Sequence, residues 1–216
     1  KDPMLPAIAS QMFMNFGHFT NALRLLDSQL KITPGDPNAL VNKGFVFLQL
    51  KRFEDAIPTF TRALAIETNE TSDLFQSALF NRAIANLQAG KLDHARQDYQ
   101  TLQKSYPTAF KLYYGLAEVA YRGKDTNAAI QNYQLYLSNA PTNTPEAQFV
   151  RDRLKELEGK APAPASPPPS AAASPAANHG AELKRVAPSA ALNFSVPSAA
   201  IAGTDCGLLS TPASSF

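Results

Sequence analysis

The chain has little of what a disulfide framework or a membrane span requires. Its 216 residues include no tryptophan and a single cysteine, Cys206, which excludes an intrachain disulfide and a cysteine cluster for a metal. No stretch reaches the roughly eighteen apolar residues of a membrane-spanning helix, and no signal peptide precedes the first helical stretch. We expect a soluble protein. Its compartment stays open, with the cytoplasm slightly favoured over a periplasmic or secreted location.

Charge of one sign is also scarce. The 20 basic and 18 acidic residues leave a formal charge of only +2. Neither sign forms a run long enough to follow a phosphate backbone, which is how proteins gain affinity for nucleic acid. Nucleic acid is therefore not expected as a partner.

Residue patterns that mark catalytic or metal sites are missing as well. The three histidines, His18, His94 and His179, share no metal-ligand spacing with one another or with Cys206. No phosphate-binding glycine loop, nucleophile elbow or paired-carboxylate arrangement is present. The sequence predicts a protein that is not an enzyme and that uses no cofactor or metal.

The two ends of the chain differ in composition from its middle. Residues 1–3, ahead of Met4, look like the remnant of an expression tag. Every residue from 161 to 177 is Ala, Pro or Ser, which leaves nothing to bury. We therefore expect a Pro/Ala/Ser-rich linker over 160–190, followed over 191–216 by a disordered or extended tail that contains apolar residues.

A repeat becomes visible when the middle of the chain is aligned with itself. Four alanines that each begin an amphipathic stretch are separated by 34, 39 and 34 positions: Ala22, Ala56, Ala95 and Ala129. A bulky side chain follows each by four residues: Leu26, Phe60, Tyr99 and Tyr133. A small one precedes each by twelve: Ser10, Gly44, Ala83 and Ala117. Small residues let antiparallel helices approach closely, so the pattern predicts eight helices in four hairpins.

Turn-forming stretches join the two halves of each unit. They lie at residues 15–18, 51–52, 89–91 and 122–125, and their lengths suit helical hairpins. The larger spacing of 39 places five extra residues in a polar run at 67–72. That run predicts a longer loop or a helix start.

These residues resemble the tetratricopeptide repeat (TPR) family, whose 34-residue unit carries small, aromatic and proline residues at fixed positions. The second repeat fits best, with Gly44, Phe47, Ala56, Phe60 and Ala63 in place. Bulky residues replace the third small one in the other repeats: Gln29, Leu102 and Tyr136. The resemblance implies an all-α fold, a right-handed superhelix of four repeats. Their ranges are about 3–36, 37–70, 76–109 and 110–143.

A ninth helix is expected after the fourth repeat. Thr144 and Pro145 offer an N-cap and a proline at the first helical position. One apolar face follows them: Phe149, Val150, Leu154 and Leu157. Arg151 would fall at a small position of a fifth repeat and block close helix approach. We therefore predict a capping helix over 145–158 and a repeat domain over 4–159.

In this family the first helix of each repeat lines a concave groove, and the resemblance assigns that role by position. The groove residues that it gives are Asn38, Val41, Asn42, Phe45, Ser77, Phe80, Asn81, Ile84, Lys111, Tyr114 and Glu118. Asn42 and Asn81 hold the same position in adjacent repeats, where a carboxamide can bond to both the carbonyl and the N–H of a peptide. The alternative is that both amides bond only to neighbouring helices or to water.

The other groove positions favour an apolar ligand. Some family members hold a terminal carboxylate with a Lys and Asn pair, and no repeat of this chain has that pair. Val41, Phe45, Phe80, Ile84 and Tyr114 instead suggest pockets for apolar side chains of an extended or helical segment. They serve this role unless the next repeat covers them.

The sequence therefore predicts an adaptor or scaffold that binds a peptide or helix of another protein in its concave groove. The apolar residues of its own tail make that tail a further candidate ligand. Two alternatives stay open: an accessory repeat domain that positions substrate for a larger enzyme, and a solenoid that self-associates into a homo-oligomer.

Overall fold

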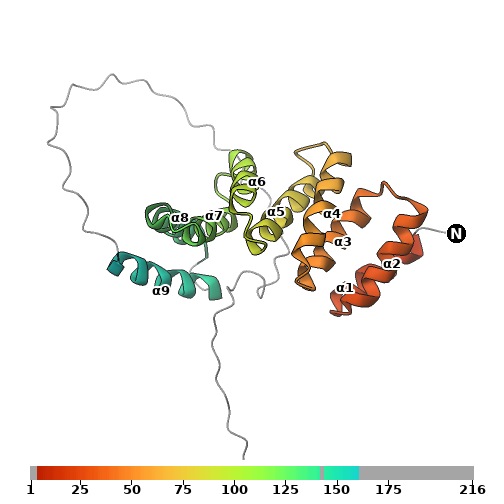
Figure 1. Ribbon diagram of the computed structural model, residues 1–216, viewed down its shortest axis with the longest axis horizontal. Helices are drawn as coiled ribbons and strands as arrows, with labels where there is room; N and C mark the ends of the chain where they lie inside the picture. The colour runs from red at the N-terminus through yellow and green to blue at the C-terminus, as the bar shows by residue number, and fades with distance from the viewer. Residues whose placement is uncertain (1–3, 142–143, 161–216) are drawn as a thin grey trace, which may run out of the picture. The chain divides into compact units, whose positions relative to one another are not determined.

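The computed structural model describes residues 4–141 and 144–160. Within that part of the chain there are nine helices and no strand. Figure 1 labels the helices in the order of the chain. The predicted all-α class is confirmed. The chain divides into two compact units, the first reaching Tyr99 and the second beginning at Gln100, and each is described by itself.

The helices follow the predicted hairpin order. Their bounds are α1 Met4–Asn15, α2 Phe19–Ile32, α3 Pro37–Gln49, α4 Phe53–Ile66, α5 Asp73–Gln88, α6 Leu92–Ser105, α7 Phe110–Arg122, α8 Thr126–Asn139 and α9 Pro145–Lys160. The division between the two units falls inside α6. The first unit therefore contains α1 to α5, and the second contains α7 to α9.

Neighbouring helices pair as the repeat predicts. In the first unit α1 packs on α2, and α3 packs on α4. Helix α2 also contacts α3, and α5 contacts both α3 and α4, so successive hairpins stack on one another. In the second unit α7 packs on α8 and α8 packs on α9.

The residues that revealed the repeat lie at these helix contacts. The four alanines are fully buried, at 0% exposure: Ala22, Ala56, Ala95 and Ala129. The bulky residues that follow them are buried as well: Leu26, Phe60, Tyr99 and Tyr133. So are the small residues that precede them: Ser10, Gly44, Ala83 and Ala117. The predicted register of the four hairpins is confirmed.

Helices α3 and α4 approach each other closely where Gly44 on α3 faces the ring of Phe60 on α4. A Cβ atom placed on Gly44 would lie 2.6 to 2.8 Å from three atoms of the Phe60 ring. Phe60 is itself fully buried, and a close-packed interior leaves such a ring no room to move. Packing therefore requires glycine at this position.

The first helix of every hairpin ends in the same way. One residue of each turn has a left-handed backbone, with φ of 73°, 56°, 77° and 62° at Gly17, Lys51, Gly90 and Lys124. In the first turn the N–H of His18 then donates to the Phe13 carbonyl at 2.8 Å, and equivalent bonds close the other three turns. This Schellman arrangement satisfies carbonyls that a helix end leaves open. The two lysines accept a φ that only glycine takes without strain.

The polar run that follows the second hairpin forms a loop, as the spacing predicted. Helix α4 ends at Ile66, and α5 begins at Asp73, three residues before the predicted start of the third repeat at 76. The start is fixed by Ser72, whose Oγ accepts a hydrogen bond from the N–H of Phe75 at 3.1 Å. Five extra residues therefore lengthen the loop and the next helix without disturbing the hairpins.

Two of the bulky residues that break the family pattern tie a hairpin to the helix that follows it. Gln29 is buried, and its Nε2 donates to Asp36 at 2.6 Å. Asp36 in turn accepts bonds from the first free N–H groups of α3. Tyr136 is buried, and its hydroxyl lies 3.0 Å from Oγ1 of Thr144, which caps α9 by accepting from the N–H of Ala147. Each bulky side chain thus holds the cap of the next helix.

The predicted capping helix is present as α9. Three residues of its apolar face are buried within the second unit: Val150, Leu154 and Leu157. The fourth, Phe149, is half-buried. The guanidinium of Arg153 lies 3.9 Å from the centre of the Tyr121 ring on α7, a cation–π contact. Helix α9 therefore covers the apolar face that α8 would otherwise expose.

Several sequence predictions concern residues outside the described part of the chain. They are the tag remnant at 1–3, most of the linker over 160–190, and the tail over 191–216 with Cys206. These stay predictions. No helix within residues 4–141 or 144–160 has both the length and the apolar character that crossing a bilayer would take.

The Gly44 contact generates a stability prediction. We expect Gly44→Ala to lower the free energy of unfolding by about 1 to 3 kcal/mol, because the new methyl group overpacks a filled core. Urea denaturation followed by circular dichroism measures the change. Gly35→Ala is the matched control, since a Cβ there meets nothing within 4 Å. Equal effects of the two substitutions would contradict the packing argument.

Candidate functional site

The predicted groove residues of the first unit lie on α3 and α5, which contact each other. On α3, Asn38 is exposed, Asn42 and Phe45 are half-buried, and Val41 is buried. Phe45 also packs on the core formed by α1, α2 and α3. Three of the four α3 residues therefore keep side-chain surface that a ligand can reach.

The predicted residues on α5 are less accessible. Ser77 is half-buried, whereas Phe80, Asn81 and Ile84 are buried, at 2%, 4% and 3% exposure. The Phe80 ring packs edge-to-face on Tyr99, with 5.8 Å between the ring centres. Phe80 and Ile84 therefore belong to the core of the first unit. An apolar residue at one of these positions on the first helix of a repeat can lie either in the groove or in the core, and the sequence pattern does not distinguish the two.

The two asparagines that share a repeat position differ in their hydrogen bonding. Asn42 makes no side-chain hydrogen bond within the described part of the chain. Asn81 donates from Nδ2 to the carbonyl of Ser77 at 2.8 Å, one turn back on its own helix. Its Oδ1 atom is buried and has no hydrogen-bond partner among the described residues. Both amides thus keep capacity to bond, and an unpaired buried acceptor is unfavourable by about 1 to 3 kcal/mol.

The three predicted residues on α7 lie in the second unit. Lys111 is half-buried, and Tyr114 and Glu118 are buried. Tyr114 packs edge-to-face against both Tyr133 and Tyr136 of α8, with ring centres 6.4 and 5.5 Å apart. Glu118 accepts a hydrogen bond from the hydroxyl of Tyr133. Tyr114 and Glu118 are therefore engaged in the packing of α7 on α8.

Burial also sets the ionisation of these residues. Burial raises the pKa of Tyr133 above the usual range of a phenol, and the neighbouring Glu118 carboxylate adds to the shift. Tyr133 consequently stays a protonated donor to Glu118. Burial lowers the pKa of Lys111, and the carboxylate of Glu146 opposes that shift.

A buried ionic cluster between α5 and α6 was not anticipated from the sequence. The Arg82 guanidinium forms a two-pronged contact with Asp98, at 2.9 and 2.7 Å, and Asn86 donates to the same carboxylate at 3.3 Å. Asp98 is 5% exposed. Its three donors offset the loss of hydration that a buried carboxylate suffers. The cluster joins the two helices of the third hairpin and is structural.

A stripe of exposed apolar residues on α1 was also missed. Its members are Leu5, Ile8 and Met12 on α1 and Phe16 in the turn just after it, and they are 70%, 54%, 55% and 73% exposed in that order. The spacing of three and four residues places Leu5, Ile8 and Met12 on one face of the helix, and Phe16 follows at the next spacing of four, one residue beyond its end. That spacing is readable in the sequence, but it does not say whether the face is covered. We call this face the α1 stripe.

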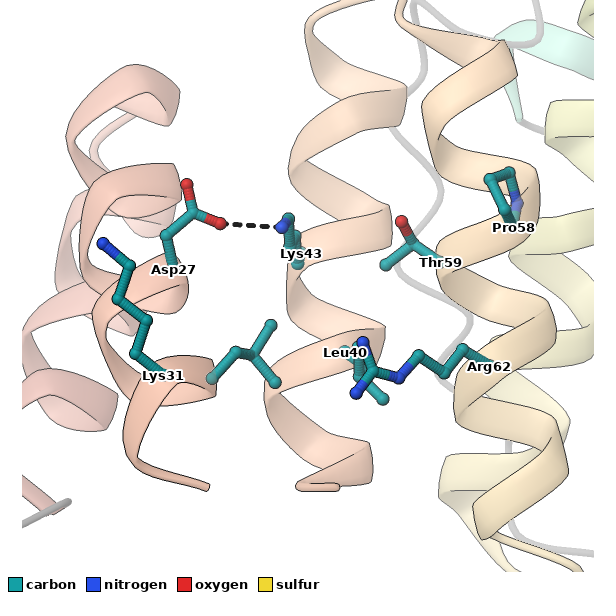
Figure 2. A pocket seen from close by; sticks show the side chains of 8 residues that line it. Asp27, Lys31, Leu40, Lys43, Pro58, Thr59 and Arg62 are labelled. Atoms are coloured by element: carbon teal, nitrogen blue, oxygen red, sulfur yellow. Dashed lines mark ion pairs between the residues drawn. The ribbon is translucent and has the colours of Figure 1, made fainter. Parts of the chain in front are cut away.

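A pocket with a charged rim lies between α2, α3 and α4. Its volume is about 480 Å³, and it is lined by Asp27, Leu30, Lys31, Leu40, Lys43, Pro58, Thr59 and Arg62. Figure 2 shows Asp27 and Lys43 facing each other across the gap between α2 and α3, while Arg62 extends from α4 toward Leu40. None of these residues belongs to the predicted groove. We call this feature the basic pocket.

The described residues contain no group of three or more His, Cys, Asp or Glu side chains that could hold a metal ion. Within the same residues, His18 and His94 are exposed and lie in different hairpins.

The fold has clear relatives among solved structures. The MamA protein of Desulfovibrio magneticus RS-1, residues 41 to the end, superposes with a TM-score of 0.62 at 18% identity, over 73% of this chain and 89% of the other. A further MamA structure gives 0.59 at 20% identity, over 73% and 88%. A tetratricopeptide repeat protein of Parabacteroides merdae gives 0.54 at 20% identity, over 76% and 67%. At such identities the likeness shows the fold alone.

A search among curated proteins finds no match. The family model for the tetratricopeptide repeat matches residues 11–70 and 76–144, which is more than half of the chain. The gap between the two matched ranges falls at the loop before α5 and its first turn. On this match, and on the hairpins described above, the chain belongs to the tetratricopeptide repeat family.

Proposed function

We propose that this chain is a non-catalytic adaptor that binds a peptide or helix of another protein along α3 and α5. Proteins of the tetratricopeptide repeat family typically bind other proteins and do not catalyse reactions. The observation that carries the proposal is the pair Asn42 and Asn81. They occupy one repeat position on two helices in contact, and both keep hydrogen-bonding capacity.

The proposed chemistry is recognition of peptide backbone. A free carboxamide donates from its nitrogen and accepts at its oxygen, so Asn42 can pair with a carbonyl and an N–H of one extended segment. Asn81 Oδ1 is buried, so in this proposal Asn81 supports the floor beneath Asn42 and does not touch the ligand itself. Each such bond contributes only about 0.5 to 1.5 kcal/mol net. The expected ligand is therefore weakly held and exchangeable, with micromolar affinity.

The burial of Phe80 and Ile84 narrows the proposed contact set. We assign direct contact with the ligand to Asn38, Asn42, Phe45 and Ser77, which all keep exposed surface. Val41, Phe80, Asn81 and Ile84 form the floor beneath them. Phe45 supplies the apolar contact, because a half-buried aromatic ring offers a large surface at small entropic cost.

The residues of the second unit keep a different role in the proposal. Lys111 is half-buried and remains a candidate ligand contact. Tyr114 and Glu118 act by packing α7 on α8 and thereby positioning Lys111.

A second candidate function is self-association, and the α1 stripe favours it. The equivalent positions of the next repeat are Ala39, Asn42, Val46 and Leu50, and those of the third are Ala78, Asn81, Ala85 and Ala89. The residues equivalent to Leu5 are buried, and so are those equivalent to Met12: Ala39, Ala78, Val46 and Ala85. Ala39 and Val46 pack in one core with Ala22 and Leu26 of α2. The positions of Leu5 and Met12 in the α1 stripe are thus those at which later hairpins stack on earlier ones, whereas Asn42, equivalent to Ile8, stays half-buried.

The composition of α1 points to a second copy of the chain as the occupant. All four stripe residues are larger than alanine, so they prevent the close packing that alanines allow in the inner repeats. They suit contact with another large apolar surface. Helix α1 contains no charged residue. Two α1 helices can therefore meet about a two-fold axis without like-charge repulsion. Contiguous exposed apolar faces of this kind typically mark interaction sites.

The asparagine pair is tested with peptides selected on the whole chain. We expect Asn42→Ala to weaken the binding of peptides selected from a random display library by about two- to tenfold, because one or two backbone hydrogen bonds are lost. Asn81→Ala should act in the same direction. Fluorescence anisotropy with labelled peptides measures both. Asn21→Ala, on the exposed face of α2, is the matched control and should change nothing. Unchanged affinity for every selected peptide in both variants overturns the groove proposal.

Self-association is tested by sedimentation velocity over a concentration series. We expect a concentration-dependent dimer of the wild type, and we expect Met12→Glu to weaken it at least tenfold, because a carboxylate would be buried in an apolar contact. Leu135→Glu is the control, since Leu135 is 44% exposed but lies on α8. A wild type that stays monomeric at every concentration eliminates this candidate. So does an equal response to the two substitutions.

A further inference from the structure

The basic pocket combines surface from three helices of the first unit. Asp27, Leu30 and Lys31 come from α2, Leu40 and Lys43 from α3, and Pro58, Thr59 and Arg62 from α4. Its volume of about 480 Å³ lies in the range of pockets that bind ligands in proteins. The pocket is therefore large enough for side chains of a partner protein.

The charges that line the pocket do not cancel. Lys43 pairs with Asp27 at 2.7 Å, which uses the one carboxylate of the lining. Arg62 donates from Nη2 to the Pro34 carbonyl at 2.7 Å, which is a neutral acceptor. Lys31 has no partner within residues 4–141 and 144–160. Two positive charges are left over, and both can serve an anionic ligand.

The bond to Pro34 prepares Arg62 for binding. It holds the guanidinium on one side of the pocket, and Figure 2 shows the side chain reaching from α4 toward Leu40. The remaining N–H donors of the guanidinium stay available, and a carboxylate can take two of them at once. A group held in place before binding loses less entropy when the ligand arrives.

Apart from Thr59, the uncharged part of the lining is apolar, and it favours anions that carry an apolar group. Leu30, Leu40 and Pro58 offer hydrocarbon surface beside the two cations. An inorganic phosphate gains nothing from that surface. A nucleic acid would need a longer run of cations and aromatic rings for its bases, and no aromatic residue lines the pocket. A segment with an acidic side chain next to an apolar one fits both features.

We propose that the basic pocket binds a short acidic segment of a partner protein. A carboxylate of the segment pairs with Arg62 and Lys31, and a neighbouring apolar side chain contacts Leu30, Leu40 and Pro58. This site shares no residue with the α3 and α5 surface or with the α1 stripe. The chain would then have a second binding surface for partners, independent of the proposed groove.

The test uses the full chain and a defined probe. The probe is the blocked peptide acetyl-Asp-Leu-Glu-Leu-amide, and its uncharged counterpart is acetyl-Asn-Leu-Gln-Leu-amide. We expect the acidic peptide to shift the ¹H–¹⁵N resonances of Leu30, Lys31, Leu40 and Arg62. The uncharged peptide should leave them in place. Binding should weaken as salt increases, because the contact is ionic.

Charge-removing variants separate the pocket from general attraction. We expect Lys31→Gln with Arg62→Gln to weaken binding at least tenfold. Lys104→Gln with Lys155→Gln removes the same net charge at exposed sites outside the pocket, and should weaken it less than twofold. Arg62→Lys keeps the charge but loses the two-pronged geometry, so an intermediate loss is expected. Thermal unfolding by circular dichroism checks that each variant is folded.

Several results would overturn the proposal. They are equal shifts with the uncharged peptide, equal losses in the two double variants, and shifts that map outside α2 to α4. Inorganic phosphate titrated alone should be weaker than the acidic peptide, and equal strength would show a simple anion site instead. Asn42→Ala should bind the acidic peptide as the wild type does. A loss there would place the peptide on α3 and α5, so the pocket proposal would fail while the groove proposal stood.

Discussion

Gly44 lies so close to the Phe60 ring that no side chain fits between them, and close helix approach of this kind organises the whole fold. The buried alanines of the second helices serve the same purpose at every hairpin. Because the same small residue recurs with the repeat, each hairpin closes in the same way. The turns repeat for the same reason, with a left-handed residue at one position in all four.

Stacking of these hairpins decides which residues remain available to a partner. A first helix in the middle of the array has one face covered by the preceding hairpin, which buries Ala39 and Val46. The same face of α1 is exposed and carries three large apolar residues, with Phe16 in the turn just after the helix as a fourth. Differences in exposure between equivalent positions therefore arise from the neighbouring hairpins.

The first unit offers three surfaces with different chemistry. The surface on α3 and α5 is neutral and presents amides, the basic pocket is cationic with an apolar floor, and the α1 stripe is apolar and uncharged. Such surfaces suit different ligands, because hydrogen bonds, ionic contacts and apolar burial have different distance and solvent requirements. A scaffold that holds several partners needs this kind of separation.

The sequence by itself determined the repeat, its register and the turns between its helices. Small residues at a fixed spacing, the turn residues and the cap at Thr144 act locally, so a linear pattern carries them. It also predicted the loop before α5 and the capping helix. The predicted alignment of the four repeats was correct because small and bulky residues recur at the helix contacts of each hairpin.

Only the tertiary structure decided which of the groove positions are accessible. Phe80 and Ile84 fit the family's groove pattern and are nonetheless buried, and Glu118 is engaged by Tyr133. The basic pocket could not be read from the sequence either, because Lys31 and Arg62 come from helices of different hairpins. Burial and convergence of charge depend on contacts between residues far apart in the chain. Those contacts exist only once the hairpins have stacked.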